Sequence, residues 1–255
     1  MRFEESGTQV AVASTLYVLA RNVGRYGTPE EDSFKTIMHR EGYKIVFQLA
    51  LTALIVTLAS LTLASGWVGL SLCVLFWVCT GLVVFFFRDP ERHIPNGAQE
   101  LVSPADGRVI GIDEVDENEF IRGRAQRVSI FMSVWNVHVN RVPLEGIVKY
   151  FRYQQGRFHV AWSPKASMEN EQTIIGIESP WGKILVRQIA GILARRVVCN
   201  LHEGNKVRRG ERFGIVKFGS RLEVFVPMNA KTTVRVKEKV RAGETAIASM
   251  GEGVE

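Results

Sequence analysis

Two long apolar runs without a charged residue constrain this chain more than any other feature. The first covers Ile45–Ala64 and the second covers Trp67–Phe87, and only Ser65 and Gly66 separate them. A helix of about 20 residues crosses the roughly 30 Å hydrocarbon core of a bilayer, because each residue rises 1.5 Å. The sequence therefore predicts a two-helix transmembrane hairpin over residues 45–87, after an N-terminal arm over residues 1–44.

A pair of helices buried in a large soluble core is the alternative, but little else in the chain could cover so much apolar surface. The open end of the hairpin is flanked by four basic residues, whereas its turn carries no positive charge. These residues are Arg40, Lys44, Arg88 and Arg92. Positive residues gather on the cytoplasmic side of membrane proteins. We therefore expect an integral protein of the cell membrane, with its open end and the domain that follows on the cytoplasmic side.

The net charge and the distribution of basic residues indicate which classes of partner the chain could bind. The formal net charge is +6 and the pI is near 9.4, which suits an anionic surface. A nucleic-acid role is poorly supported, because the basic residues are scattered without an aromatic stacking motif. The arm contains an apolar patch, Val10–Val23, that fits an amphipathic helix on the membrane or an ordinary surface helix. Cys73, Cys79 and Cys199 have no metal-ligand spacing, so we expect no metal site.

The remaining segment, residues 88–255, has a different pattern. Runs such as RVIGIDEV, RVSIFMSV, KILVRQIA and SRLEVFV alternate or cluster apolar and β-branched residues between Gly, Pro, Asn and Asp. This pattern is typical of strands joined by turns, and it predicts a mostly-β domain.

Two stretches of this domain resemble each other. LHEGNKVRRGERFGIV begins at Leu201 and VKEKVRAGETAIA begins at Val236, and both place a glycine before a glutamate and an apolar strand. Such turns, with glycine at positive φ, occur in barrel-sandwich domains of the lipoyl or biotinyl kind. A membrane-tethered carrier or adaptor module is therefore an alternative function, although the modifiable lysine tip that a carrier needs is missing from the sequence.

Gly219 and Ser220 separate two alternating runs, GIVKF and RLEVFVP. A plain turn is the simplest interpretation, because Gly-Ser turns are common. The chemical alternative is self-cleavage: the Ser220 hydroxyl attacks the Gly219 carbonyl to form an ester. Loss of the α-proton then eliminates the ester and leaves dehydroalanine, and hydrolysis of that product gives a pyruvoyl group.

Two further residues could assist a reactive serine. Asp106 lies in SPADGRV between a proline turn and a strand, and His138 lies in WNVHVNRVP. Taken alone, Asp106 fits a turn aspartate and His138 a core histidine. With Ser220 they could also form an Asp-His-Ser arrangement, in which the histidine removes the hydroxyl proton and the aspartate orients the imidazole.

Six collinear stretches carry a more specific resemblance. The stretches are FFRDPERHIP, VSPADGRV, FMSVWNVHVNRVPLEG, PKASMENEQ, VRRGERFGIVKFGSRLEVFVP and VRAGETAIA. Their order and spacing resemble those of the short-form (type II) phosphatidylserine decarboxylases, which are pyruvoyl-dependent. The match runs from about Phe85 to Ala248, and a hairpin before it is usual in that family. It implies conversion of phosphatidylserine to phosphatidylethanolamine and CO2 through a Schiff base on a pyruvoyl group, without a metal.

The resemblance also implies residue roles. Cleavage at Gly219-Ser220 would give a β chain, residues 1–219, and an α chain, residues 220–255, that begins with the pyruvoyl group. Asp106 resembles the acid of the processing triad and His138 its histidine, with His138 also a candidate acid in decarboxylation. Long-form relatives carry a second histidine three residues later, where this chain has Arg141, so His138 serves both steps or Arg141 assists electrostatically.

The expected partners are the bilayer, the lipid substrate and further copies of the chain in a homo-oligomer. Four basic residues are possible contacts for the substrate's phosphate, although solvated surface charge is the simpler interpretation of each: Arg88, Arg92, Arg157 and Lys165.

Overall fold

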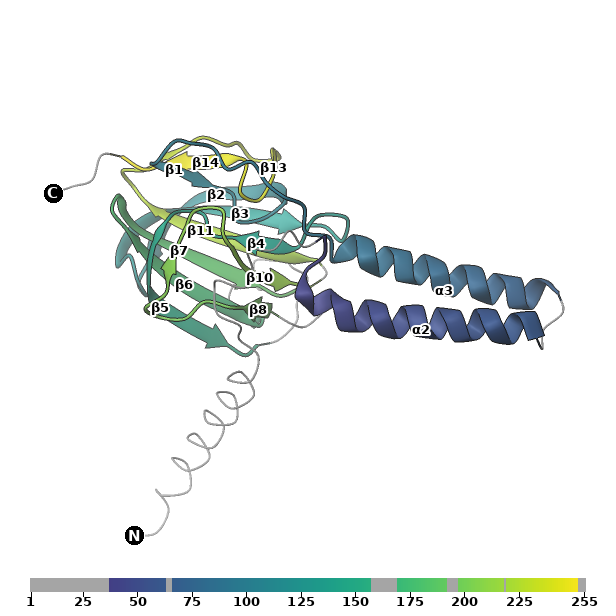
Figure 1. Ribbon diagram of the computed structural model, residues 1–255. Coiled ribbons are helices and arrows are strands. Elements are labelled where there is room, and N and C mark those ends of the chain that lie inside the picture. Colours follow the sequence, from purple (N-terminus) through teal and green to yellow (C-terminus); the bar gives the residue numbers. More distant parts are fainter. Residues whose placement is uncertain (1–36, 63–65, 157–168, 192–196, 218, 252–255) are drawn as a thin grey trace, which may run out of the picture. The chain divides into compact units, whose positions relative to one another are not determined.

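A computed structural model of the chain describes residues 37–62, 66–156, 169–191, 197–217 and 219–251 (Figure 1). Within these ranges two helices precede fourteen strands. The helices are α2 (Arg40–Thr62) and α3 (Trp67–Phe86). The strands are β1 (Glu100–Val102), β2 (Gly107–Glu117), β3 (Gly123–Met132), β4 (Val139–Arg141), β5 (Gly146–Gln154), β6 (Gln172–Ser179), β7 (Gly182–Ile189), β8 (Val197–Cys199), β9 (Lys206–Val207), β10 (Arg212–Val216), β11 (Ser220–Pro227), β12 (Lys231–Thr232), β13 (Lys239–Val240) and β14 (Ala246–Ser249). The fold class predicted from the sequence, a helical hairpin followed by a mostly-β domain, is confirmed. Several features of the sequence analysis lie outside the described ranges, namely the patch at 10–23, Arg157 and Lys165.

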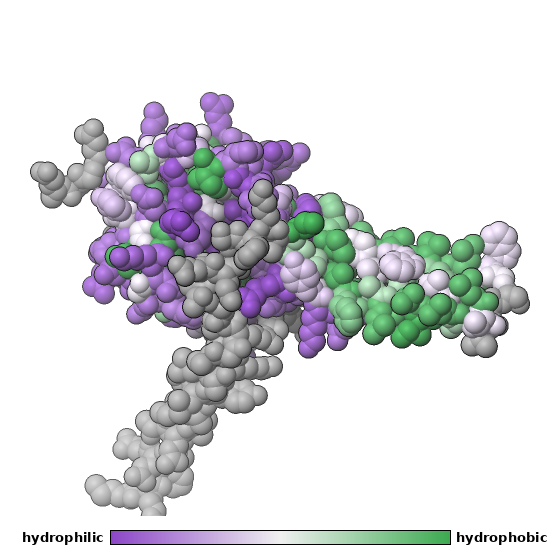
Figure 2. Space-filling model, in the orientation of Figure 1, coloured by the Kyte–Doolittle hydropathy of each residue, from purple (hydrophilic) through white to green (hydrophobic). Residues whose placement is uncertain are grey.

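The helices of the hairpin are long and apolar enough to cross a membrane, and their side chains are exposed. Only 6% of the apolar window of α2 and 11% of that of α3 are buried. Figure 2 shows hydrophobic residues covering the hairpin, whereas the visible face of the β domain is mostly hydrophilic. A helix pair buried in the core of this chain would show the opposite pattern.

Small and hydroxyl-bearing residues join the two helices. Ala53 is fully buried between them, and the indole Nε1 of Trp77 donates to the hydroxyl of Thr57 at 3.2 Å. The Ser60 hydroxyl donates to the carbonyl of Gly69 at 3.4 Å. Small residues allow close approach of helices in lipid, where packing and hydrogen bonds replace the hydrophobic effect.

The β domain consists of one large and two small antiparallel sheets. The eight-stranded sheet has the order β13-β2-β3-β11-β7-β6-β5-β9, and the three-stranded sheets have the orders β1-β14-β12 and β4-β10-β8. The main hydrophobic core takes residues from all three sheets, and it includes Leu101, Ile130, Leu144, Phe213 and Leu222. Alternation along the strands directs one face of the large sheet into this core.

The strand order reveals an internal duplication. If β2, β3, β11 and β13 are exchanged with β5, β6, β7 and β9, respectively, the large sheet has the same strand order when read from its other end. The corresponding exchange of β1, β14 and β12 with β4, β10 and β8 interconverts the two small sheets. Two turns that correspond to each other in this duplication are joined by backbone hydrogen bonds. The Val102 amide donates to the Pro143 carbonyl and the Arg141 amide donates to the Pro104 carbonyl, both at 2.9 Å. Both turns place a proline three residues before a glycine, in SPADG and in VPLEG.

The glycine turns predicted from the repeated stretches also belong to the two halves. Gly210 has φ +79° and Gly243 has φ +76°, so both lie in the left-handed region that favours glycine. The Gly210 amide donates to the Val142 carbonyl and the Gly243 amide donates to the Ser103 carbonyl, both at 2.8 Å. The positive φ expected at these turns is therefore confirmed.

The base of the hairpin packs against the β domain. Met38, Phe86, Phe87 and Ile215 form a buried hydrophobic cluster, in which Ile215 comes from β10. The Lys217 ammonium, directly after β10, lies 3.2 Å from the Glu41 carboxylate in the first turn of α2. These contacts connect the helices of the hairpin to the strand that leads to Gly219 and Ser220.

Candidate active site

Gly219 and Ser220 lie at the break between β10 and β11, as the alternating pattern predicts. Gly219 has φ +64°, and a Cβ added there would meet no atom within 4 Å. The backbone conformation, rather than crowding, therefore favours glycine at this position. Ser220 is the first residue of β11, it pairs with Met132 of β3, and its side chain is fully buried.

The Ser220 hydroxyl is held only weakly among the described residues. Its Oγ lies 3.7 Å from the Met132 sulfur, and a thioether is a poor hydrogen-bond acceptor. The Asn140 amide lies 3.8 Å from the same sulfur, and Gln188 Nε2 donates to Asn140 Oδ1 at 2.8 Å. Ser220, Met132, Asn140 and Gln188 are all completely buried. A small polar group is thus enclosed in the hydrophobic core beside the candidate nucleophile.

Sequence reasoning did not identify Met132, Asn140 or Gln188 as parts of this site. Gln188 offered one signal, because it shares the core-facing register of β7 with the buried apolar residues Ile184 and Val186. A polar side chain in such a register needs a partner inside the protein. Asn140 supplies one, and the remaining Gln188 oxygen has no partner among the described residues.

His138 is completely buried directly before β4. Its Nδ1 lies 2.9 Å from the Asn136 carbonyl, which can only accept, so Nδ1 carries the proton and Nε2 has the free electron pair. Nε2 is buried without a hydrogen-bond partner among the described residues. Burial lowers the pKa of His138 to about 4 from an ordinary 6.5, the Asn136 carbonyl opposes the shift, and the charge of Arg88 adds to it. The imidazole is therefore neutral at pH 7 and able to accept a proton at Nε2.

The pairing of β4 with β10 brings His138 and Ser220 to the same end of these strands. Val139 pairs with Ile215, so His138 comes directly before the paired segment and Ser220 follows it by a short connection. Asn140 also links the two regions. It lies in β4, two residues after His138, and its amide contacts the Met132 sulfur next to Ser220. Within the described ranges, however, the Ser220 hydroxyl contacts Met132 and makes no hydrogen bond with His138.

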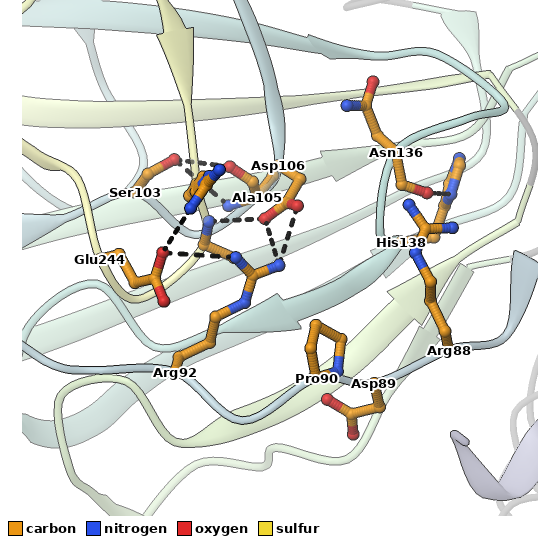
Figure 3. Close-up of polar contacts among 12 residues, drawn as sticks. Arg88, Asp89, Pro90, Arg92, Ser103, Ala105, Asp106, Asn136, His138 and Glu244 are labelled. Atoms are coloured by element: carbon orange, nitrogen blue, oxygen red, sulfur yellow. Dashed lines mark hydrogen bonds and ion pairs between the residues drawn. The ribbon is translucent and has the colours of Figure 1, made fainter. Parts of the chain in front are cut away.

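Asp106 lies in a second polar group (Figure 3). Its carboxylate receives two hydrogen bonds from Arg92 Nη2, at 3.0 and 2.8 Å, and one from the Ala242 amide at 2.8 Å. Glu244 lies 3.5 Å from the other terminal nitrogen of Arg92. The Asp106–His138 contact of a serine triad is not among the contacts of the described residues, because the Asn136 carbonyl occupies the Nδ1 position. Asp106 instead joins the segment after α3 to the C-terminal strands.

Arg141 is buried in β4 and has a structural set of contacts. It donates to the Gly210 carbonyl at 3.0 Å, to Asp89 at 3.2 Å and to the Pro90 carbonyl at 3.0 Å. Arg212 binds the other oxygen of Asp89 at 2.6 Å. Burial lowers the pKa of Arg141, and the charge of Arg212 lowers it further while Asp89 raises it. None of these contacts joins Arg141 to His138.

Arg88 lies beside His138, on the opposite side of the view from Asp106 and Glu244 (Figure 3). It follows the end of α3 and donates to the carbonyls of Phe85 and Trp135, at 2.7 and 2.6 Å. No carboxylate within the described ranges forms an ion pair with it. In the same ranges, no group of three or more His, Cys, Asp and Glu side chains could hold a metal ion.

Comparisons with known proteins identify relatives over most of the chain. The profile of the family described as phosphatidylserine decarboxylase matches residues 79–248. A protein of Syntrophus aciditrophicus is 46% identical over 221 residues, which are 86% of this chain and 99% of the relative. One from Magnetococcus marinus is 40% identical over 215 residues, with 84% and 95% covered. One from Salinibacter ruber is 48% identical over 168 residues, with 65% and 74% covered. All three are named phosphatidylserine decarboxylase proenzyme.

Proposed function

The chain belongs to the phosphatidylserine decarboxylase family, and on this premise we propose that it converts phosphatidylserine to phosphatidylethanolamine and CO2 with a pyruvoyl group made from its own Ser220. One observation carries the proposal. Ser220 is completely buried at the start of a central strand, directly after a glycine in the left-handed region, and its hydroxyl has only a thioether beside it among the described residues. A plain surface turn would have no reason to enclose a serine in this way.

Self-cleavage begins when the Ser220 oxygen adds to the carbonyl carbon of Gly219 and the peptide C–N bond breaks, which leaves an ester. Removal of the Ser220 α-proton then breaks the ester bond, so Gly219 becomes a C-terminal carboxylate and residue 220 becomes dehydroalanine. Water adds to that residue and ammonia leaves, which produces the ketone. Neutral His138 is suited to remove the hydroxyl proton in the first step, because its pKa of about 4 leaves Nε2 unprotonated at pH 7.

The fold would keep the two products together. The segment from residue 220 onward contributes β11 to the middle of the large sheet, where β11 pairs with both β3 and β7. β13 and β14 of the same segment pair with β2 and β1. Cleavage would therefore remove one covalent bond and leave the antiparallel pairing and the shared hydrophobic core in place.

The residues around position 220 fit a pyruvoyl group. A group of that size would replace the serine beside Met132, whose sulfur also contacts the Asn140 amide, and the Nε2 of His138 lies at the same end of β4 and β10. Bonded to the amine of the substrate, the pyruvoyl group would supply an electron sink, which takes up the electron pair that remains on the carbon when CO2 leaves.

His138 would then move the proton that the reaction needs. Decarboxylation consumes one proton, which must reach the carbon that loses CO2. Nε2 can take a proton from the ammonium group of the substrate, since that amine must be neutral to react, and it can return a proton to the carbon afterwards. Asn136 fixes the ring tautomer through its carbonyl, so the proton is carried at Nε2 in both directions. The single histidine of this segment would thus serve both processing and decarboxylation.

The roles proposed for Asp106 and Arg141 are indirect. The resemblance implies that Asp106 acts in processing, and its contacts with Arg92 and with the Ala242 amide support a positioning role, because they join residues on both sides of the cleavage site. Arg141 joins β4 to the segment after α3 in a similar way. Both would hold the elements that carry His138 and Ser220.

The hairpin gives the reaction its location. The acyl chains of the substrate remain in the bilayer, so the reacting headgroup lies near its surface, and His138 contacts Phe86 at the end of α3. We propose that α2 and α3 span the cell membrane with the β domain on the cytoplasmic side, because basic residues flank the open end of the hairpin. Net positive charge favours contact with anionic lipid, at about 1 kcal/mol per basic residue near the surface.

A denaturing intact-mass measurement of the full chain, with and without Ser220→Ala, tests the proposal. We expect two fragments from the unsubstituted chain, split between residues 219 and 220, with a pyruvoyl terminus on the smaller one. The Ser220→Ala chain should remain intact and inactive on phosphatidylserine vesicles. A single intact species from the unsubstituted chain would instead favour a membrane-tethered carrier or adaptor of the lipoyl or biotinyl kind.

A further inference from the structure

Arg88 differs from the other arginines near the base of the hairpin because no carboxylate among the described residues forms an ion pair with it, although burial lowers its pKa and the more distant charge of Asp106 opposes that shift. Arg92 binds Asp106, whereas Arg141 and Arg212 share Asp89. Arg88 makes hydrogen bonds to two backbone carbonyls and no ion pair within the described ranges. Those carbonyls use two of its five N–H groups, so the guanidinium is held in position and keeps donors for a ligand.

The surroundings of Arg88 place it at the level of lipid headgroups. Its guanidinium carbon lies 3.8 Å from the ring centroid of Phe85, in the last turn of α3. The Trp135 ring, 66% exposed, lies 6.4 Å from the same Phe85 ring, and Val134 is exposed next to it. Exposed aromatic rings at the end of an apolar helix are typical of the boundary between lipid and water. A cation among them meets the layer that contains lipid phosphates.

Arg88 also lies next to the candidate proton carrier. The positive charge of Arg88 contributes to the lowered pKa of His138, and Figure 3 shows the guanidinium beside the imidazole. The carbonyl that Arg88 binds belongs to Trp135, and the next residue, Asn136, supplies the carbonyl that binds His138 Nδ1. An anion bound to Arg88 would therefore lie at a fixed place relative to the reacting atoms.

The substrate of the proposed reaction carries two anions, a phosphodiester and a carboxylate. The carboxylate loses its charge as CO2 forms, so a cation bound to it would stabilise the substrate more than the transition state. The phosphodiester keeps its charge throughout, and binding energy from such a non-reacting group can orient the reacting one. Arginine suits phosphate because its planar group offers paired donors.

We propose that Arg88 binds the phosphodiester of the lipid substrate and so sets the position of the headgroup relative to His138 and residue 220. This inference rests on the proposed function and identifies one of the four basic residues considered in the sequence as the phosphate ligand. Arg92 is already engaged by Asp106 and Glu244, and the other two lie outside the described ranges.

The test compares Arg88→Gln and Arg88→Lys with Arg40→Gln in the processed full-length enzyme. Arg40 is an exposed arginine at the start of α2, so it controls for a general loss of positive charge near the membrane. We expect all three to cleave themselves. Arg88→Gln should raise KM for phosphatidylserine in mixed micelles by about 10- to 100-fold, because charge-assisted hydrogen bonds to phosphate are lost. It should also lower kcat, because the headgroup is no longer held in position relative to His138 and residue 220. Arg88→Lys should raise KM less, and Arg40→Gln should match the unsubstituted enzyme.

Two soluble inhibitors separate the anions. Glycerophosphoethanolamine has the amine and the phosphodiester but no carboxylate, whereas serine has the amine and the carboxylate but no phosphate. Arg88→Gln should weaken inhibition by the first about as much as it raises KM, and leave inhibition by serine unchanged. Equal weakening of both, or weakening for serine alone, would overturn the assignment.

The remaining outcomes are also decisive. If Arg88→Gln does not cleave itself, the same two inhibitors are measured on Arg88→Lys, and an unchanged ratio of their inhibition constants overturns the proposal. An equal rise in KM for Arg40→Gln overturns it as well. A normal KM in Arg88→Gln, in an enzyme that cleaves and turns over, overturns only the role of Arg88. An unsubstituted chain that neither cleaves nor decarboxylates overturns the proposed function itself.

Discussion

The His138 imidazole packs against the phenyl ring of Phe86, the last residue of α3, with 4.4 Å between the two ring centroids. Phe86 also belongs to the hydrophobic cluster at the base of the hairpin, with Phe87 and Ile215. The hairpin therefore supplies part of the apolar surroundings that keep His138 neutral. In this protein the anchor and the candidate site share a residue contact, so changes at the helix end should alter proton chemistry.

Phe86→Ala should move the pH dependence of self-cleavage. Removing the ring admits water to His138 and raises its pKa from about 4 toward 6.5. Because the neutral imidazole is the proposed base, the cleavage rate should reach half its maximum near pH 4 in the unsubstituted chain and at a clearly higher pH in the variant. The measurement follows cleavage of freshly synthesised proenzyme on denaturing gels at a series of pH values.

Phe87→Ala is the matched control for that change. Phe87 packs in the same cluster and lies 5.1 Å from the Phe86 ring, yet no ring contact joins it to His138 among the described residues. Both variants should lose about 3–5 kcal/mol of stability, as is usual when a buried phenylalanine becomes alanine. An identical midpoint in the two variants would show that the hairpin affects processing through stability alone.

The low pKa of His138 also predicts how stability depends on pH. The folded pKa, about 4, lies below the ordinary value of 6.5, so the unfolded chain binds the proton first as the pH falls. This contribution to stability is complete above pH 6.5, is lost between pH 6.5 and 4, and amounts to about 3 kcal/mol at 1.36 kcal/mol per pKa unit. To isolate the contribution of His138, urea unfolding in detergent is measured across this pH range for the Ser220→Ala chain and for the Ser220→Ala chain that also carries His138→Asn. Parallel pH profiles of the two chains would contradict a depressed pKa.

Asp106→Asn and Arg92→Gln should have similar effects. Their side chains are 13% and 7% exposed and form a two-bond ion pair, and removing one partner of a buried pair costs about 3–5 kcal/mol. If Asp106 acts by holding Arg92 and the turn at Ala242, both variants should slow self-cleavage and lower stability to a similar extent. An Arg92→Gln chain that cleaves normally beside an inert Asp106→Asn chain would instead make Asp106 a direct member of the processing machinery.

The sequence predicted those features that depend on local pattern. The charge-free runs located both helices, although α2 begins at Arg40 rather than Ile45. The absence of charge marks the hydrocarbon layer, and a helix can extend into the headgroup layer, where Lys44 and Arg40 are tolerated. Alternation around Gly219 and Ser220 likewise located the break between β10 and β11.

The environment of the site could not be predicted in the same way, because long-range strand pairing creates it. Met132 lies beside Ser220 through the pairing of β3 with β11, across 88 residues of sequence. The carbonyl of Asn136, rather than a side chain, binds His138 Nδ1, and a backbone group leaves no trace in the residue types. The duplication was visible only at the glycine turns, since the paired SPADG and VPLEG turns share just proline and glycine.

The ion pair between Lys217 and Glu41 gives the last prediction, because it joins the first turn of α2 to the chain just before the cleavage site. The side chains are 12% and 24% exposed, and their charged atoms lie 3.2 Å apart. Lys217→Ala should slow self-cleavage several-fold by loosening the connection between β10 and Gly219, and Glu41→Gln should do the same. A double-mutant cycle on cleavage rates should give a coupling of about 1 kcal/mol, near the upper end for partly exposed pairs. Additive effects of the two substitutions would mean that each residue acts through other contacts, and that the hairpin base influences processing only through the cluster of Phe86, Phe87 and Ile215.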